Sequence, residues 1–470
     1  MKRIGKAGTE LKEISNEVCV EALCQPGTQA MIRDSLEETG RRERRNCPMS
    51  SMLTVWLILT MPLRRSDSIP DALAWLISCL RGRFEDLSLQ PVTDGAPYHA
   101  RKRVGVAPLI ALFRRLAASF KSHPIFHGLR VFALDGTTLD MPEIKANLAT
   151  FGKDELAAFP RIRLVALLDV CTRRITRLRL LFWRRSEHNA SSSLTAGLGS
   201  GDLLLADRGL YSFPLMVQLV RQKASFLFRL PKNRIVKKKK QVGPGEWIGW
   251  ICYRVPKEEI PHVPGLKVDT VSRKYAQIRL KVRLIKYRIG NGTPNLLVTN
   301  LMETEKIPVR ELVLLYHRRW DIELAYDEVK IHLSQSPAGA IKTILRSKSP
   351  RLVIQEVYAL LIAYNLVRTT MLESASLHDL PPEDLSFVGA LNAIKLSMPH
   401  LASARDAHQL RRIYNRLLDD IAQCLNPRPR RGRQYDRVVR RNQVVFPVKR
   451  LHHQQRRIDF ANAVVLEEAA

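Results

Sequence analysis

Apolar positions in the first quarter of the chain recur with a helical period. They form the run MLTVWLILTMPL (52–63), then SIPDALAWLISCL (68–80) with a proline suited to a helix start, and VAPLIALFRRLAASF (106–120). The run at 52–63 is too short to span a bilayer and contains Pro62, so we expect a buried core helix. The pattern predicts an all-helical domain over residues 31–122, preceded by a charged, weakly patterned and poorly ordered N-terminus, 1–30.

From about residue 128 the pattern changes to that of strands. LRVFALDGTTLDMP (129–142) contains a short apolar strand, and RIRLVALLDVCTRRITRLRLLFW (161–183) has the pattern of a hairpin with its turn at CTRR. Residues 201–230 follow the order buried strand, loop, helix, strand. This succession predicts the first part of an α/β core over residues 123–230.

The α/β pattern is then interrupted. β-like runs such as QIRLKVRLIKYRI (277–289) predict a mostly β insertion over residues 231–300. Helical patterns return in the second part of the core, 301–375, whose strongest helix is at 350–372, and continue in a basic C-terminal region, 376–470.

Charge favours a polyanionic partner. The chain has 76 Lys and Arg against 45 Asp and Glu, a formal charge of +31, which indicates nucleic acid above all and a membrane surface as the alternative. Between residues 428 and 457, eleven Lys or Arg accompany a single acid, Asp436. Such a stretch suits phosphate contacts or a flexible arm, and equally a solvated loop.

The cysteines indicate a reducing compartment. They are seven in number, scattered, and without the paired short spacings of a zinc site, so we expect free thiols. No apolar signal core follows the basic start of the chain, which predicts a cytoplasmic protein. The seven are Cys19, Cys24, Cys47, Cys79, Cys171, Cys252 and Cys424.

The stretch YHRRWDIELAYDEVK (316–330) concentrates aromatic hydroxyl, cations and carboxylates. If one helix runs from about 308 to 333, four of its polar residues form a stripe about 60° wide and about 21 Å long beside the apolar face. This position suits a cleft wall where a carboxylate holds a metal and the other groups hold phosphates, although helices also carry charge at their core boundary. The four residues are Tyr316, Arg319, Glu323 and Lys330.

Other polar residues of this stretch are expected to have ordinary roles. On the same wheel Arg318, Asp321 and Glu328 lie opposite the core and are expected in solvent. Trp320 is expected to pack, and Asp327 to be a solvated acid.

Two further acids follow apolar strands at glycine turns. Asp135 stands before Gly136, and Asp207 stands in LLLADRG. The carboxyl ends of strands are where α/β layers place chemistry, but acids before glycine are also ordinary turn formers. Two such acids with a helix-borne Glu323 can hold two divalent cations for phosphodiester chemistry.

Three segments resemble a known family. ALDGTTLDMP, LLLADRGLYSF and YHRRWDIELAYDEVK are similar to the catalytic blocks of DDE insertion-sequence transposases, in group four with the signature Tyr-x2-Arg-x3-Glu-x6-Lys. The likeness extends over roughly residues 31–450 and is weakest in the insertion. It implies a ribonuclease-H-like core split by a β-rich insertion, with a helical DNA-binding domain before it and a helical, basic region after it.

The resemblance also implies roles for individual residues. Asp135, Asp207 and Glu323 would be the metal-binding catalytic triad, for two Mg²⁺ ions with Mn²⁺ as a substitute. The enzyme would cut double-stranded DNA at the ends of its own element and join them to target DNA, as a dimer on DNA. Contacts to DNA phosphate would come from Tyr316, Arg319 and Lys330.

Two alternatives stay open. One is a catalytically silent DNA-binding protein derived from a transposase, against which the intact triad and phosphate residues argue. The other is a metal-dependent nuclease without strand joining, because cutting and joining use the same residues.

Several other residues carry weaker signals. Trp247 and Trp250, near the lysines 237–240, suit core packing better than stacking on an unpaired base. Asp140 and Asp169 are spare acids; Asp140 follows the first block closely enough to support the metal ligands from behind, but a turn role is the favoured expectation for it. No metal site is expected at the histidines, which lack spaced partners: His188, His452 and His453.

Overall fold

This computed structural model describes most of the chain between residues 28 and 466. The described residues are 28–42, 49–81, 93, 95–155, 157–231, 236–260, 266–290, 292–333, 345–404, 406–426, 433–434 and 458–466. They form two units: unit 1 comprises Met1–Ser122, Gly136–Ala190 and Ile322–Pro427, and unit 2 comprises His123–Asp135, Ser191–Asp321 and Arg428–Ala470. The chain passes from one unit to the other several times, and strand β1 begins in unit 2 and ends in unit 1.

Unit 1 begins with helices, as the apolar pattern predicts. Every residue of α3 is buried, which explains its uninterrupted apolar sequence and confirms the expected core helix. The hydroxyl of Ser50 caps this helix by accepting a hydrogen bond from the Leu53 N–H at 3.1 Å. The helices of this region are α2 (Thr28–Glu38), α3 (Ser51–Thr60), α4 (Ile69–Arg81), α5 (Ala96–Val104) and α6 (Ala107–Ser119).

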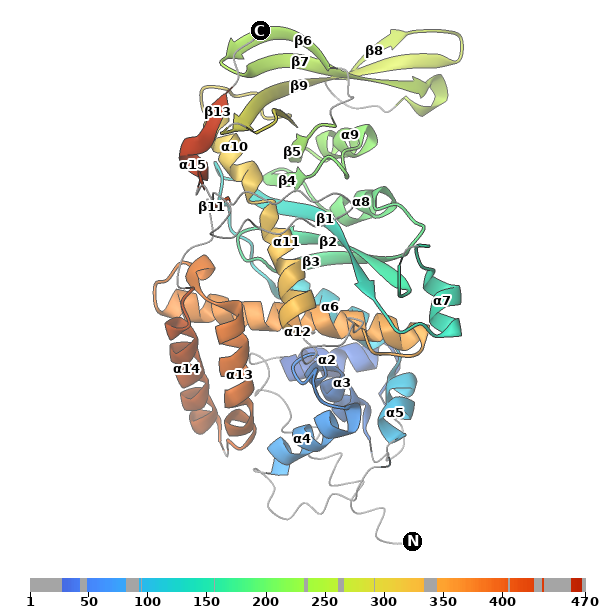
Figure 1. The fold of residues 1–470 in the computed structure, drawn as a ribbon, viewed down its shortest axis with the longest axis vertical. Helices are drawn as coiled ribbons and strands as arrows, with labels where there is room; N and C mark the ends of the chain where they lie inside the picture. The colour runs from blue at the N-terminus through green and yellow to red at the C-terminus, as the bar shows by residue number, and fades with distance from the viewer. Residues whose placement is uncertain are drawn as a thin grey trace, which may run out of the picture. The chain divides into compact units, whose positions relative to one another are not determined.

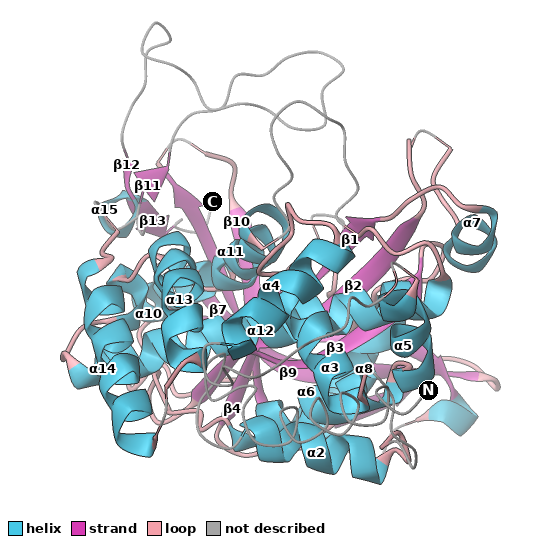
Figure 2. Ribbon diagram, turned by 90° about the horizontal axis from the view of Figure 1, so that it is seen from below, coloured by secondary structure: helices cyan, strands magenta, loops and turns pink. Residues whose placement is uncertain are grey.

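A long helix, α12 (Pro350–Leu377), forms the centre of unit 1 (Figure 1). It packs against α3 and α6, and on another side against the pair α13 (Phe387–Ala402) and α14 (Ala407–Gln423), which lie side by side (Figure 2). Among the described helices α12 alone is long and apolar enough to cross a membrane, but 83% of its most apolar window is buried inside the protein. Its apolar composition therefore reflects a core helix.

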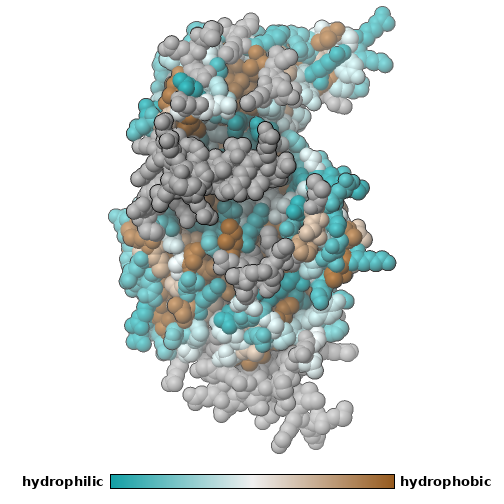
Figure 3. Space-filling model, viewed as in Figure 1, coloured by the Kyte–Doolittle hydropathy of each residue, from teal (hydrophilic) through white to brown (hydrophobic). Residues whose placement is uncertain are grey.

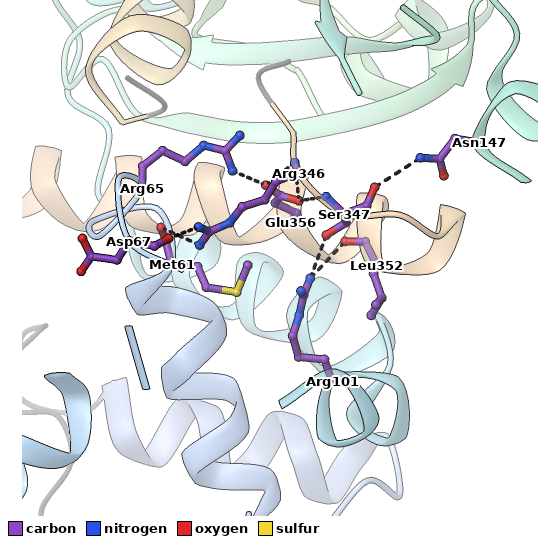
Figure 4. A network of polar contacts seen from close by, with 9 residues as sticks. All are labelled: Met61, Arg65, Asp67, Arg101, Asn147, Arg346, Ser347, Leu352 and Glu356. Atoms are coloured by element: carbon purple, nitrogen blue, oxygen red, sulfur yellow. Dashed lines mark hydrogen bonds and ion pairs between the residues drawn. The ribbon is translucent and has the colours of Figure 1, made fainter. Parts of the chain in front are cut away.

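A buried carboxylate on α12 organises the chain that leads into this helix (Figure 4). Glu356, which is 3% exposed, accepts hydrogen bonds from the backbone N–H groups of Arg346 at 3.0 Å and Ser347 at 2.9 Å. Its Oε1 also accepts from the guanidinium of Arg65 at 2.7 Å. Buried charge is tolerated here because each carboxylate oxygen is paired.

Two arginines extend the same network to the N-terminal helices (Figure 4). Arg346 donates to the carbonyl of Asp67 at 2.6 Å, beyond the end of α3. Arg101 on α5, 2% exposed, donates to the Ser347 hydroxyl at 3.0 Å and to the side chain of Gln355 at 2.9 Å. The start of α12, the segment between α3 and α4, and helix α5 are thus held together by hydrogen bonds within unit 1.

The predicted hairpin at 161–183 is present. Strands β2 (Arg161–Asp169) and β3 (Ile175–Phe182) pair antiparallel across the CTRR turn. Asn365 of α12 fixes the start of β3, because its amide accepts from the Ile175 N–H at 2.9 Å and donates to the Ile175 carbonyl at 2.8 Å. The short helix α7 (Lys145–Phe151) and the turn η3 (Pro382–Asp384) belong to the same unit.

Three parallel strands form the centre of unit 2. β1 (Arg130–Asp140) pairs with β4 (Asp202–Ala206), and β4 pairs with β5 (Ser225–Arg229). Helix α9 (Phe213–Arg221) connects β4 to β5, and α8 (His188–Thr195) precedes β4. β10 (Asn295–Thr299) adds to β5 in the antiparallel sense. The mixed α/β class expected from the sequence is therefore confirmed.

The residues between β5 and β10 form antiparallel strands (Figure 1). The longest, β9, pairs with β7, β8 and β10, and with a strand near the end of the chain, β13 (Val464–Leu466). Trp247 is 5% exposed and packs in this layer, as expected. The strands are β6 (Val236–Gly243), β7 (Glu246–Pro256), β8 (Leu266–Thr270) and β9 (Tyr275–Ile289).

On the face drawn in Figure 3 the described residues are mostly hydrophilic, with apolar residues in separate small patches. Among the cysteine side chains that the structure describes, Cys171, Cys252 and Cys424 are free thiols. The remaining elements are the turn η1 (Lys257–Glu259), the strands β11 (Arg433–Gln434) and β12 (Ile458–Asp459), and α15 (Phe460–Ala463).

Candidate active site

Three charged residues stand at the same level in unit 2, where the parallel pairing of β1, β4 and β5 ends. β1 itself continues to Asp140, so the expectation that Asp135 ends its strand at a glycine turn is wrong. The register pairs Leu134 of β1 with Ala206 of β4, and Ala206 with Phe228 of β5. The next residues along the three strands are Asp135, Asp207 and Arg229. Because neighbouring strands lie about 4.8 Å apart, these side chains form one row across the three strands.

Hydrogen bonds in the turn after β4 fix the position of Asp207. β4 ends at Ala206, and the Asp207 carboxylate accepts a hydrogen bond from the Arg208 N–H while its backbone carbonyl accepts from the Leu210 N–H at 3.0 Å. This turn returns the chain toward α9 and leaves the side chain of Asp207 half-buried. Asp207 therefore both forms the turn and lies at the end of β4.

The stretch 316–330 is divided into three pieces, whereas the sequence predicts one helix. α10 (Val309–His317) ends in a tight turn, in which Arg318 N–H donates to the Leu315 carbonyl at 2.9 Å and Arg319 N–H to the Tyr316 carbonyl at 3.1 Å. α11 (Trp320–Asp327) follows, and then a π-helix, η2 (Glu328–His332). The single-helix wheel is therefore wrong in its angles after Tyr316.

Arg319, in the turn between α10 and α11, pairs with the carboxylate of Asp135 on β1. Its guanidinium Nη1 lies 3.5 Å from Asp135 Oδ2, and the two side chains are only 6% and 20% exposed. Its Cζ lies 5.2 Å from the centre of the Trp320 ring. A cation held this way balances the charge of Asp135 within unit 2.

Tyr316 is buried beside the same charges. It is 4% exposed, and its hydroxyl has no hydrogen-bond partner among the described residues. Burial raises the pKa of Tyr316 most, the charge of Arg319 opposes this rise, and Asp207 adds to it. Tyr316 therefore stays a neutral hydrogen-bond donor at physiological pH, and it is buried rather than on the boundary stripe expected from the wheel.

The neighbours of Tyr316 are also neutral. Burial, with the positive charges of Arg319 and Arg229, lowers the pKa of His317 to about 4. Burial likewise raises the pKa of Tyr287 on β9 to about 12. Positive charge in this part of unit 2 thus comes from the two arginines and not from histidine.

The remaining two predicted residues lie farther along the same stretch, in unit 1. Glu323 is half-buried on α11, and Lys330 is half-buried on η2. Among the residues that the structure describes, no three His, Cys, Asp or Glu side chains gather as a metal-ligand group. The donor chemistry nevertheless fits hard divalent cations, since Asp135, Asp207 and Glu323 all offer carboxylate oxygens.

Arg229 was missed by the sequence analysis. It ends β5, directly beside Asp207 in the register, and its charge acts on Tyr316 and His317. The strand-end argument that selected Asp135 and Asp207 applies equally to Arg229, so the signal was present in the pattern FLFRL.

Three expectations for the stretch 316–330 are wrong. Trp320, expected to pack, is 53% exposed. Asp321, expected in solvent, is 4% exposed and pairs with Arg318 at 3.4 Å. Glu328, also expected in solvent, pairs with the buried Arg368 of α12. Asp327 is exposed, as expected.

The spare acids have structural roles. Asp140 pairs with Arg161 at 2.8 Å. Asp169 lies in the hairpin turn, where it accepts from the Cys171 N–H at 3.0 Å and from the Thr172 hydroxyl at 3.1 Å. The histidines 452 and 453 and most of the basic stretch 428–457 lie outside the described residues.

Trp250 and the lysines 237–240 lie on the antiparallel strands of unit 2. Trp250 is partly exposed, and Lys267 Nζ and Arg279 Cζ lie 5.4 and 5.8 Å from its ring centre. The side chains of Lys237 and Lys240 on β6 are exposed. The partly exposed ring of Trp250 therefore lies among cationic side chains.

Comparison with known proteins finds similar sequences over most of the chain. A family model described as Transposase DDE domain matches residues 126–366, about half of the chain, and a model described as Insertion element 4 transposase N-terminal matches residues 18–114. The chain is 26% identical over 431 residues to Transposase InsG for insertion sequence element IS4 of Escherichia coli K12, covering 89% of this chain and 91% of that protein.

Two further proteins are similar over part or most of the chain. Putative transposase InsZ of Escherichia coli K12 is 26% identical over 229 residues, which are 46% of this chain and 72% of that protein. A cryo-EM structure of the piggyBac transposase synaptic complex with hairpin DNA has a TM-score of 0.43 at 11% identity, covering 87% of this chain and 85% of that chain.

Proposed function

The chain belongs to the DDE transposase family, in the insertion-sequence 4 group, and from this premise we propose how its own residues carry out transposition. As a DNA transposase it cleaves and transfers DNA strands. We propose that it cuts at the ends of its own insertion element and joins them to target DNA, with Asp135, Asp207 and Glu323 as the catalytic triad. The observation that carries the proposal is the adjacency of Asp135 and Asp207 at the point where the parallel pairing of β1 and β4 ends.

The catalytic core is proposed to be ribonuclease-H-like. The parallel strands β1, β4 and β5, the antiparallel hairpin of β2 and β3, and a Glu-bearing helix after the last strand support this assignment. In this arrangement the antiparallel strands β6 to β9 are an insertion between β5 and the helix. The predicted limits of the domains, 31–122 for the DNA-binding domain and 231–300 for the insertion, remain part of the proposal.

Membership of the family implies dependence on divalent metal. We assign two Mg²⁺ ions, replaceable by Mn²⁺, to the carboxylates of Asp135, Asp207 and Glu323. When bound, such ions supply a means to activate the attacking water or 3′-hydroxyl and to stabilise the leaving oxygen. The three carboxylates hold the ions, while Arg319 beside Asp135 keeps local charge balanced.

DNA phosphate is proposed to bind beside these carboxylates. Arg319 and Arg229 present planar guanidinium donors that suit phosphate oxygens, and the buried hydroxyl of Tyr316 is a donor without a protein partner among the described residues. Lys330 adds a point charge farther along the same stretch. Because His317 stays neutral, it does not compete with the arginines for phosphate.

Double-stranded DNA is the partner that the family and the charge of +31 indicate. We assign recognition of the element ends to the helical region, and contacts to the DNA backbone to the basic C-terminal residues. Both ends of an element must be processed together, so we propose a dimer on DNA. The protein acts where the element resides, in the bacterial cytoplasm at the nucleoid.

A strand-transfer assay separates this proposal from a nuclease without joining. A labelled duplex that carries the pre-cut element end would be incubated with a supercoiled plasmid and Mg²⁺ or Mn²⁺. Covalent joining of label to plasmid is the expected result, and an Asp207→Asn variant should bind the end but not join it. Cutting of a full-length end substrate without any joined product would establish the nuclease instead.

A further inference from the structure

An ion pair at the π-helix η2 joins two residues that are not part of the Tyr-x2-Arg-x3-Glu-x6-Lys signature. Glu328, the first residue of η2, pairs with the guanidinium of Arg368 on α12. Both side chains are in the interior of unit 1, with 15% and 4% of their surface exposed. The helix wheel of an uninterrupted helix would instead place Glu328 in solvent.

Arg368 is held by more than this carboxylate. Its Nε lies 3.3 Å from the Tyr364 hydroxyl, and its Cζ lies 5.2 Å from the ring centre of Phe387. Tyr364 itself donates to the Arg173 carbonyl at 2.7 Å. Burial alone would lower the pKa of Arg368, but the influence of Tyr364 and Glu328 raises it, so the guanidinium stays charged. A fixed cation therefore faces Glu328.

The π-turn changes the direction of the residues that it contains. The Leu333 N–H donates to the Glu328 carbonyl at 3.1 Å, five residues back, while Val329 and Leu333 are each 1% exposed. One extra residue in the turn rotates later positions by up to about 100° relative to an α-helix. Lys330 lies inside this turn, so its direction depends on the turn being kept.

We propose that Glu328 and Arg368 are positioning residues, whose buried ion pair holds the π-turn that directs Lys330 toward DNA phosphate. This inference rests on the proposed function, in which Lys330 contacts phosphate. Glu328 itself touches no DNA in this account, since its carboxylate faces Arg368. The residue therefore extends the Tyr-Arg-Glu-Lys set by a group that acts through Lys330.

The test is the salt dependence of binding to an element-end duplex. Loss of one phosphate contact lowers the slope of log K against log salt by about one. We would compare wild type, Lys330→Gln, Glu328→Gln and the double variant. Asp327→Asn is the matched control, because the neighbouring Asp327 is exposed and the substitution removes the same charge.

The expected result is a non-additive pattern. Lys330→Gln and Glu328→Gln should each lower the slope by about one, and the double variant should lower it no further. The rate of single-turnover cleavage at saturating DNA should fall about tenfold or more in Lys330→Gln and in Glu328→Gln. The exchange of charges in Glu328→Arg with Arg368→Glu should restore part of the rate that Glu328→Gln loses. If Glu328→Gln does not fold, Arg368→Lys is the second variant. It keeps the buried positive charge, so the protein is expected to fold. It should still lower the slope by about one, because an ammonium does not replace the planar guanidinium in this pair.

Three results would overturn the inference. Folded Glu328→Gln that matches Asp327→Asn in slope and cleavage would show that the pair does not act through Lys330. A double variant with the summed loss of both single variants would show two independent effects. An unchanged slope in Lys330→Gln itself would remove the phosphate contact on which the inference rests, and would thereby identify the proposed function as the failing step.

Discussion

Arg319 Nη1 lies 3.5 Å from Asp135 Oδ2, and the guanidinium that makes this contact is 6% exposed. A planar guanidinium can pair with a carboxylate and a phosphate at once, whereas an ammonium is a single point charge. Arg319→Lys should therefore bind DNA but cut it about 10- to 100-fold more slowly, measured in single-turnover cleavage. Arg310→Lys, on the exposed side of α10, is the matched control. Equal rates for both variants would refute the role of Arg319.

Tyr316→Phe should separate stability from activity. The variant removes a buried hydroxyl without a partner among the described residues, so thermal stability should be unchanged or slightly higher. If the hydroxyl donates to phosphate, cleavage should slow about 10- to 150-fold, as expected for a lost hydrogen bond to a charged group, about 1.5–3 kcal/mol. Tyr414→Phe loses a hydrogen bond to Glu373. We therefore expect this variant to be less stable than wild type but to cleave DNA at the normal rate. A destabilised Tyr316→Phe with normal cleavage would contradict the assignment.

The strand-end row illustrates what the sequence can predict. Asp135 and Asp207 each follow a run of apolar residues, and the parallel pairing of β1 with β4 places them side by side. The sequence pattern did not reveal that β1 continues past Asp135 to Asp140. Arg229 obeys the same rule but was overlooked, because an arginine after an apolar run is common at the end of a strand.

The broken helix illustrates what the sequence does not reveal. Residues 309–333 contain neither Gly nor Pro, so no helix-breaking residue in this range predicts the turn after His317 or the π-turn at Glu328. The partner of Glu328 is Arg368, forty residues later, and only the tertiary packing of α12 brings the two together. The burial of Glu328 therefore could not be derived from periodicity.

His317 gives the protein a predictable pH dependence. Its pKa is lowered to about 4, so the folded protein prefers the neutral ring while the unfolded chain binds a proton near pH 6.5. The stabilising contribution is complete above about pH 6.5 and is lost as the pH falls toward 4. Urea unfolding between pH 4 and 7 should show a smaller decline for His317→Asn than for wild type. His400→Asn, at an exposed position on α13, should keep the wild-type decline, and an unchanged decline in His317→Asn would contradict the burial argument.

Trp247 and Trp320 should respond oppositely to substitution by alanine. Trp247 is 5% exposed, so Trp247→Ala should lower the free energy of unfolding by about 3–5 kcal/mol. Trp320 is 53% exposed beside Arg319, so Trp320→Ala should change stability by less than about 1 kcal/mol. Stacking on a DNA base would make the same variant bind element-end DNA about tenfold more weakly. Urea unfolding and fluorescence titration with DNA measure the two effects, and unchanged DNA affinity would assign Trp320 no role in binding.

The central claim, that Asp135, Asp207 and Glu323 form one catalytic set, is tested most directly through Glu323. Cleavage of a labelled duplex carrying the element's own end would be followed with Mg²⁺ or Mn²⁺ for wild type and Glu323→Gln, with DNA binding measured in the same samples. We predict that wild type nicks at the element boundary, while Glu323→Gln binds equally well and cuts at least about a thousandfold more slowly. Equal cleavage by the two proteins, or binding without cleavage by both under either metal, would contradict the account.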